Sequence, residues 1–108
     1  MKFAALLSLA GMAQAITIGV FENQKNGGGQ FKAFATPAAT CRNFLGNDAY
    51  WNDRISYVQI PPNVLCQFWD DINCKGGSLV IPASSGGVDV NILANHNDKI
   101  SSFACYNK

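Results

Sequence analysis

The chain has 108 residues, of which eight are basic, seven are acidic and one is histidine. This length and near-neutral charge exclude a large multidomain enzyme, and they leave no basic stripe for nucleic acid or an anionic membrane. We therefore predict one small domain without a nucleic-acid partner.

Residues 1–15 have the pattern of a secretory signal peptide. Lys2 supplies the positive start, a mostly apolar run extends to Met12, and Ala13-Gln14-Ala15 forms an A-x-A cleavage site. The apolar run is far shorter than the ~20 residues of a spanning helix. We expect a secreted, extracellular mature chain of residues 16–108 with no membrane span.

Short runs rich in β-branched and aromatic residues fill the mature chain, bounded by Gly, Pro, Asn and Asp. Such runs are typical of strands. No stretch keeps an apolar 3.6-residue period long enough for a helix, so the predicted fold class is all-β. The runs are ITIGVF (16–21), ISYVQI (55–60), VLCQFW (64–69), SLVI (78–81) and ISSFAC (100–105).

The mature chain also contains an internal repeat. FENQKNGG at 21–28 matches WDDINCKG at 69–76, and the pentad NDRIS at 52–56 matches NDKIS at 97–101. Pro61-Pro62-Asn63 separates the halves, because proline cannot continue a central strand. We predict two halves, 16–62 and 63–108, each a Greek key of four strands, packed together as a sandwich.

Each half resembles a βγ-crystallin Greek-key motif. The family's hairpin signature is an aromatic residue, an acidic residue and a later glycine. It occurs as Phe21-Glu22 with Gly28, and as Trp69-Asp70 with Gly76. The resemblance implies a single βγ-crystallin-like domain over 16–108.

The family's second signature has two Asn/Asp residues, two variable residues, Ser/Thr and Ser. The second half meets it in full at 97–102, whereas the first half has Tyr57 in the last place. The hairpins also depart from the family pattern, with Asn26 and Cys74 where a second aromatic residue is usual.

Taken alone, each pentad is ordinary turn chemistry, since Asn, Asp and Ser bond their own backbone. The resemblance adds calcium, which family members with this signature often bind through hard oxygen ligands. We expect weak sites, with a Kd of ~10⁻⁴–10⁻³ M. Each pentad would supply a carboxylate (Asp53, Asp98), a hydroxyl (Ser56, Ser101) and a carbonyl (Arg54, Lys99), with hairpin carbonyls pairing Asp70 to the Asp53 loop and Glu22 to the Asp98 loop.

Four cysteines in a small exported domain favour two disulfides over a metal site. The resemblance implies the pairing. In the family fold, strands one and four of a motif are neighbours, which joins Cys66 to Cys105. The third strand crosses to the partner's sheet, which joins Cys41 to Cys74.

No arrangement of nucleophile and base predicts catalysis, and His96 is interpreted as a solvated turn residue. Two functions remain open for a monomer. One is a non-enzymatic calcium-binding module. The other is a secreted protein with vestigial calcium sites, similar to antimicrobial proteins, killer toxins, effectors or proteinase inhibitors. Its surface loops would then contact an extracellular protein or a cell-surface target.

Overall fold

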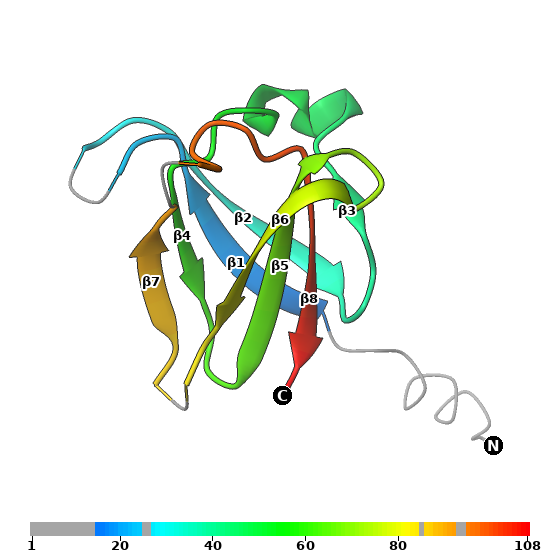
Figure 1. The fold of residues 1–108 in the computed structure, drawn as a ribbon. Coiled ribbons are helices and arrows are strands. Elements are labelled where there is room, and N and C mark those ends of the chain that lie inside the picture. The colour runs from blue at the N-terminus through cyan, green and yellow to red at the C-terminus, as the bar shows by residue number, and fades with distance from the viewer. Residues whose placement is uncertain (1–14, 25–26, 85, 93–94) are drawn as a thin grey trace, which may run out of the picture.

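Figure 1 shows the computed structural model, which describes residues 15–24, 27–84, 86–92 and 95–108. Asn26 and most of the predicted signal peptide, residues 1–14, lie outside the described residues. The predicted all-β class is confirmed. The elements are β1 (Ala15–Phe21), β2 (Phe31–Pro37), β3 (Arg42–Asn43), a 3₁₀ helix η1 (Gly46–Trp51), β4 (Tyr57–Ile60), β5 (Val64–Asp71), β6 (Lys75–Pro82), β7 (Val88–Asn91) and β8 (Ser102–Asn107).

The strands form two four-stranded antiparallel sheets that pack face to face (Figure 1). Their orders are β2-β1-β4-β7 and β3-β8-β5-β6. Each sheet thus holds three strands from one half of the chain and the third strand of the other half. This exchange of β3 and β7 is the crossing expected from the resemblance, and it makes the sandwich one body.

Alternation along the strands determines which side chains enter the core. On β1, Ile16, Ile18 and Val20 are buried, and on β5 the same spacing buries Cys66 and Phe68. Side chains two apart on a strand share a face, so these two rows meet between the sheets. Four phenylalanines fill the centre with mutual edge and stacked contacts: Phe34, Phe44, Phe68 and Phe103.

Strands one and four of each half are neighbours. β1 pairs with β4 through Gly19 and Gln59, and β5 pairs with β8 through Cys66 and Cys105. The Cys66–Cys105 disulfide joins two buried cysteines whose Cα atoms lie 4.0 Å apart. The second disulfide, Cys41–Cys74, has a Cα separation of 6.0 Å. The structure therefore contains both disulfides in the predicted pairing.

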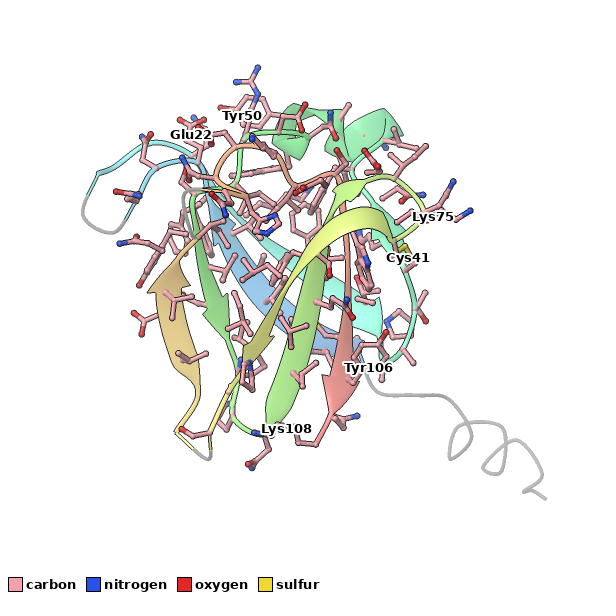
Figure 2. The ribbon with its side chains drawn as sticks, in the orientation of Figure 1. Glu22, Cys41, Tyr50, Lys75, Tyr106 and Lys108 are labelled. Atoms are coloured by element: carbon pink, nitrogen blue, oxygen red, sulfur yellow. A yellow bond between two sulfur atoms is a disulfide. The ribbon has the colours of Figure 1, made fainter. Side chains whose placement is uncertain are left out.

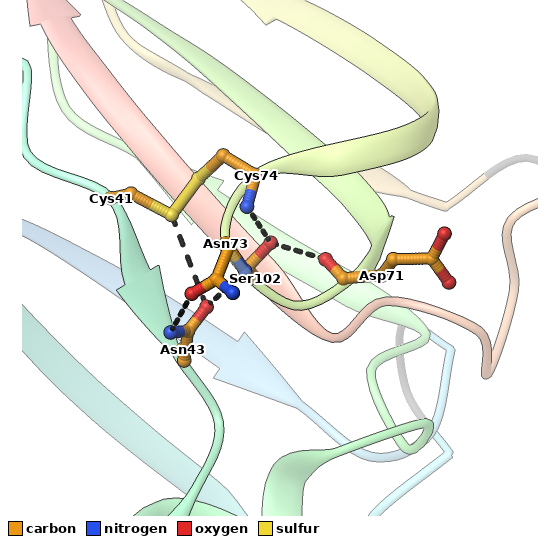
Figure 3. The surroundings of a disulfide bond; sticks show 6 residues. All are labelled: Cys41, Asn43, Asp71, Asn73, Cys74 and Ser102. Atoms are coloured by element: carbon orange, nitrogen blue, oxygen red, sulfur yellow. Dashed lines mark hydrogen bonds between the residues drawn. A yellow bond between two sulfur atoms is a disulfide. The ribbon is translucent and has the colours of Figure 1, made fainter.

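The second hairpin is held tightly around the buried hydroxyl of Ser102 (Figure 3). This hydroxyl donates to the carbonyl of Asp71 at 2.6 Å and accepts from the amide of Cys74 at 3.0 Å. Asn43 on β3 bonds both the side chain and the amide of Asn73. These polar contacts and the Cys41–Cys74 bond fasten the hairpin to a strand from the other half.

The 3₁₀ helix η1 was not predicted, because its sequence has no helical period. Its contacts are tertiary. Trp51 is buried, and Asp48 accepts hydrogen bonds from Arg42 at 2.8 Å and Lys32 at 3.3 Å. Among the described residues, no helix is long and apolar enough to cross a membrane.

The Asp48 contacts predict an acid-dependent loss of stability. Burial alone would raise the pKa of Asp48, but the hydrogen bonds and charges of Arg42 and Lys32 outweigh it and hold that pKa below its usual 3.8. The stabilisation is therefore complete above pH 3.8 and is lost as the pH falls through the folded-state pKa. Asp48→Asn should lower the free energy of unfolding by about 1 kcal/mol at neutral pH, measured by urea denaturation.

Below pH 3.8 the difference in the free energy of unfolding between Asp48→Asn and the parent should shrink. Asp71→Asn removes an exposed carboxylate and serves as the control, with little effect at either pH. A deficit in Asp48→Asn that persists undiminished in acid would contradict the ion-pair explanation.

The buried disulfide yields a second prediction. Replacing Cys66 and Cys105 by valines should cost about 2–5 kcal/mol of stability. Replacing both by serines should cost more, since each buried hydroxyl without a partner adds about 1–3 kcal/mol. Thermal melts of the two double variants test this, and equal melting temperatures would show that the site is wetter than its burial indicates.

Candidate functional site

The two pentad loops, 52–56 and 97–101, interlock at one end of the sandwich. The amide of Asp53 donates to the carbonyl of Ile100 at 3.0 Å, and the amide of Asp98 donates to the carbonyl of Ile55 at 3.2 Å. Each loop thus supplies the acceptor for the equivalent amide of the other. The internal repeat of the sequence becomes an approximate twofold arrangement in space.

Both aspartates have left-handed backbones, with φ of 60° at Asp53 and 59° at Asp98. Aspartate tolerates this conformation better than most residues, because its short polar side chain can bond locally. The turn chemistry predicted for the pentads is therefore present in both.

The hydroxyl and carboxylate partners come from different pentads. Ser56 Oγ donates to Asp98 Oδ1 at 2.9 Å, and Ser101 Oγ lies 3.5 Å from Asp53 Oδ1. The sequence groups the hydroxyl and the carboxylate of one pentad, whereas in the structure each hydroxyl contacts the carboxylate of the other pentad. The reciprocal amide bonds set each aspartate beside the serine of the opposite loop, which no spacing within one pentad could reveal.

Each crossed pair adjoins one hairpin. The amide of Ser56 donates to the carbonyl of Phe21 at 2.9 Å, and the amide of Ser101 donates to that of Trp69 at 2.8 Å. The Ser56–Asp98 pair therefore lies beside Glu22, and the Ser101–Asp53 pair lies beside Asp70. The structure thus brings the eight predicted site residues to the two interlocked loops and their adjoining hairpins.

The side chain of Glu22 is occupied by protein contacts at this end of the molecule (Figure 2). Its carboxylate accepts hydrogen bonds from the hydroxyl of Tyr50 and from the amide of Gln30. These bonds, that of Tyr50 first, hold the pKa of Glu22 below its usual value of 4.5. Glu22 can offer its carbonyl to a ligand while its side chain stays engaged.

His96 lies in a turn, as predicted, but its side chain is not solvated. Its Nδ1 lies 3.0 Å from Asp70 Oδ1, and its side chain is only 18% exposed. The two residues are far apart in sequence and meet because the second hairpin lies against the 97–101 loop. Sequence reasoning had no signal for this contact.

A shallow hollow of about 200 Å³ lies between the loops and the first hairpin. Three carboxylates line it, those of Glu22, Asp53 and Asp98, together with the cationic Arg54. The guanidinium of Arg54 lies 4.4 Å from the ring centroid of Tyr50. The hollow is therefore net acidic, which favours a cation.

No three His, Cys, Asp or Glu side chains converge on one point among the described residues. A metal at these loops would depend on hydroxyl, carbonyl and amide oxygens beside one carboxylate. Two such oxygens lack a protein donor in the described chain, namely the buried Oδ1 atoms of Asn52 and Asn97. The donor set is all oxygen and rich in acceptors, which suits calcium.

Comparison of whole structures identifies the fold. A βγ-crystallin domain from Flavobacterium johnsoniae superposes with a TM-score of 0.63 and 22% identity, over 84% of this chain and 94% of that one. The chain has the βγ-crystallin fold. No family model matches the sequence, and no curated protein matches it.

Two further structures superpose on this chain about equally well. The βγ-crystallin from Ciona intestinalis gives a TM-score of 0.60 at 18% identity, over 82% of this chain and 96% of that one. A double mutant of clostrillin in complex with nickel gives a TM-score of 0.62 at 15% identity, over 84% of this chain and 98% of that one. At these identities the likeness establishes the fold alone.

The crossed contacts predict which residues are coupled without any metal. In chelator, a double-mutant cycle of Ser56→Ala with Asp98→Gly should give a coupling of about 0.5–1.5 kcal/mol, the value of one hydrogen bond. Glycine is chosen because it keeps the left-handed backbone without strain.

The matched control is Ser56→Ala with Asp53→Gly, two residues of one pentad. That pair should show a coupling near zero in the same urea titrations. Stronger coupling within the pentad than across the loops would contradict the crossed arrangement.

Proposed function

We propose that the chain is an exported, disulfide-bonded, non-enzymatic βγ-crystallin-fold protein that binds calcium weakly at its two interlocked loops. The observation that carries the proposal is the crossed contact of Ser56 with Asp98, repeated by Ser101 with Asp53. The leader pattern at 1–15 and the two disulfides support an oxidising, extracellular location.

One site would use the carboxylate of Asp98 and the hydroxyl of Ser56, with the main-chain carbonyl of Glu22 from the adjoining hairpin. The other would use Asp53, Ser101 and the carbonyl of Asp70. The carbonyls of Arg54 and Lys99 and bound water would complete the shells, since calcium takes ~6–8 oxygens. When bound, calcium would supply charge that holds the four segments together.

Weak affinity follows from the donor set. Each site has one carboxylate in direct reach, and the cationic Arg54 lines the hollow. In addition, the carboxylate of Asp98 already accepts a hydrogen bond at 2.9 Å, which calcium would have to replace. These features favour the Kd of ~10⁻⁴–10⁻³ M typical of extracellular modules.

The test is a calcium titration by calorimetry and thermal melting. With a Kd of about 1 mM, about 10 mM calcium should stabilise the fold by about 1.4 kcal/mol per site. Ser56→Ala and Asp98→Gly should remove the same binding event, whereas Ser101→Ala and Asp53→Gly should remove the other.

Magnesium at the same concentration is the control for ionic strength, and it should give a much smaller melting shift. No heat and no melting shift with calcium would refute the proposal. Loss of the same event in Ser56→Ala and Asp53→Gly would refute the crossed ligand assignment while leaving calcium binding intact.

A further inference from the structure

The outer face of the sheet β2-β1-β4-β7 carries a groove that borders the hollow of the pentad loops at Asn23. One part is a hollow of about 400 Å³ beside the first hairpin, with Phe21, Phe31, Tyr57, Gln59 and Asp89 among its lining residues. Two further hollows of about 290 and 340 Å³ adjoin it, and all three share Gln59. We call this continuous surface the outer groove.

Three aromatic rings form one wall of the outer groove. The ring centroid of Phe21 lies 4.7 Å from that of Phe31 and 4.9 Å from that of Tyr57. Tyr57 is buried, whereas Phe31 is 53% exposed. One ring therefore presents an open apolar surface, and the two behind it hold it in place.

The fold itself does not require these aromatic residues. In the first half, Phe21 pairs across the sheet with Phe31 and Tyr57. In the second half, the equivalent Trp69 pairs with Ser78 and Ser102. The same strands thus form with two serines where the first half has two aromatic residues.

The floor of the groove differs between the halves in the same way. Gly19 pairs with Gln59, and its equivalent Gln67 pairs with Ala104. In the second half, Gln67 Nε2 donates to Ser78 Oγ at 3.0 Å and covers the strand. At Gly19 a Cβ atom would lie 3.0 Å from the ring of Phe31, so glycine keeps the floor open.

Polar groups with both donors and acceptors line the rest of the groove. The amide of Gln59 lies at its centre, and Asn23 and Gln24 lie at the hairpin end. Asp89 accepts a hydrogen bond from the hydroxyl of Tyr57, which raises the pKa of that tyrosine. No Lys, Arg or His is among the described residues that line the three hollows, so none of these residues offers an anion a cationic partner.

We propose that the outer groove binds a neutral oligosaccharide. A pyranose ring has an apolar C–H face that can stack on the exposed ring of Phe31, and its hydroxyls can bond the amide of Gln59 and the carboxylate of Asp89. Because three hollows adjoin one another, the groove fits a chain of several sugar rings better than it fits a monosaccharide.

A cationic ligand fits these contacts less well. Aromatic cation sites need open ring faces around the charge. Here the three rings pack on one another and do not surround a charge with open faces. A polyhydroxylated ligand uses the open face of one ring and the amide groups together.

The experiment titrates the ¹⁵N-labelled protein with cellohexaose, laminarihexaose and chitohexaose, each to about 10 mM, which detects a Kd of millimolar order. At least one should shift the amide signals of Gly19, Phe31, Gln59 and Asp89. The titration is run in calcium and in chelator, so that its outcome is independent of the calcium sites.

Phe31→Ser and Tyr57→Ser replace each aromatic residue by serine, the residue at the equivalent position of the second half. Each change should weaken binding about tenfold. Gly19→Gln should block the groove. Tyr106→Ser removes an exposed aromatic residue from the other sheet and should leave affinity unchanged. Dispersed spectra check that every variant is folded.

The proposal is overturned if none of the three sugars shifts the groove signals. It is also overturned if Phe31→Ser binds as well as the parent, or if only choline, titrated in parallel, produces the shifts. Concentration-dependent shifts without ligand, removed by Phe31→Ser, would assign the groove to self-association instead.

Discussion

The exchange of β3 and β7 between the two sheets is the constraint on which the rest of the structure depends. Because the third strand of each half pairs in the sheet of the other half, neither sheet is complete without both halves. The same exchange brings the two pentad loops against each other, where the amides of Asp53 and Asp98 bond across. It also sets β3 beside the second hairpin, so that Cys41 reaches Cys74. Core, crosslink and candidate site thus share one topological cause.

Within this frame the two halves differ at the register position of Tyr57 and Ser102. Ser102 uses its hydroxyl to hold the short second hairpin, donating to Asp71 and accepting from Cys74. Tyr57, its equivalent, is too large for that role and instead contacts Phe21 and Asp89. The first hairpin closes differently. Gly29 rather than the predicted Gly28 is the structural equivalent of Gly76, since each lies two residues before the strand partner of the hairpin aromatic.

The sequence was sufficient for features that repeat or alternate. The matching hairpins and pentads predicted two Greek keys, and the expected neighbours of strands one and four predicted the Cys66–Cys105 disulfide. It was insufficient where the contact joins segments that no periodicity relates. The helix η1 is held by tertiary contacts such as that of Asp48 with Arg42, and His96 is half-buried beside Asp70. The partner of Ser56 could not be read from one pentad, because it depends on how two loops are oriented in space.

The turn and metal interpretations of the pentads are not alternatives. The left-handed aspartates make the turns, and these turns aim each carboxylate at a serine of the opposite loop. Without metal, the serine hydroxyl donates a hydrogen bond to one oxygen of the carboxylate. The loops are therefore ordered before any ion binds. At the proposed sites calcium would have to displace those bonds, which would lower affinity, but it would meet loops that need little further ordering. The proposed weak sites would therefore stabilise a structure that the protein already forms by itself, whereas a domain whose loops ordered only with calcium would unfold when it is removed.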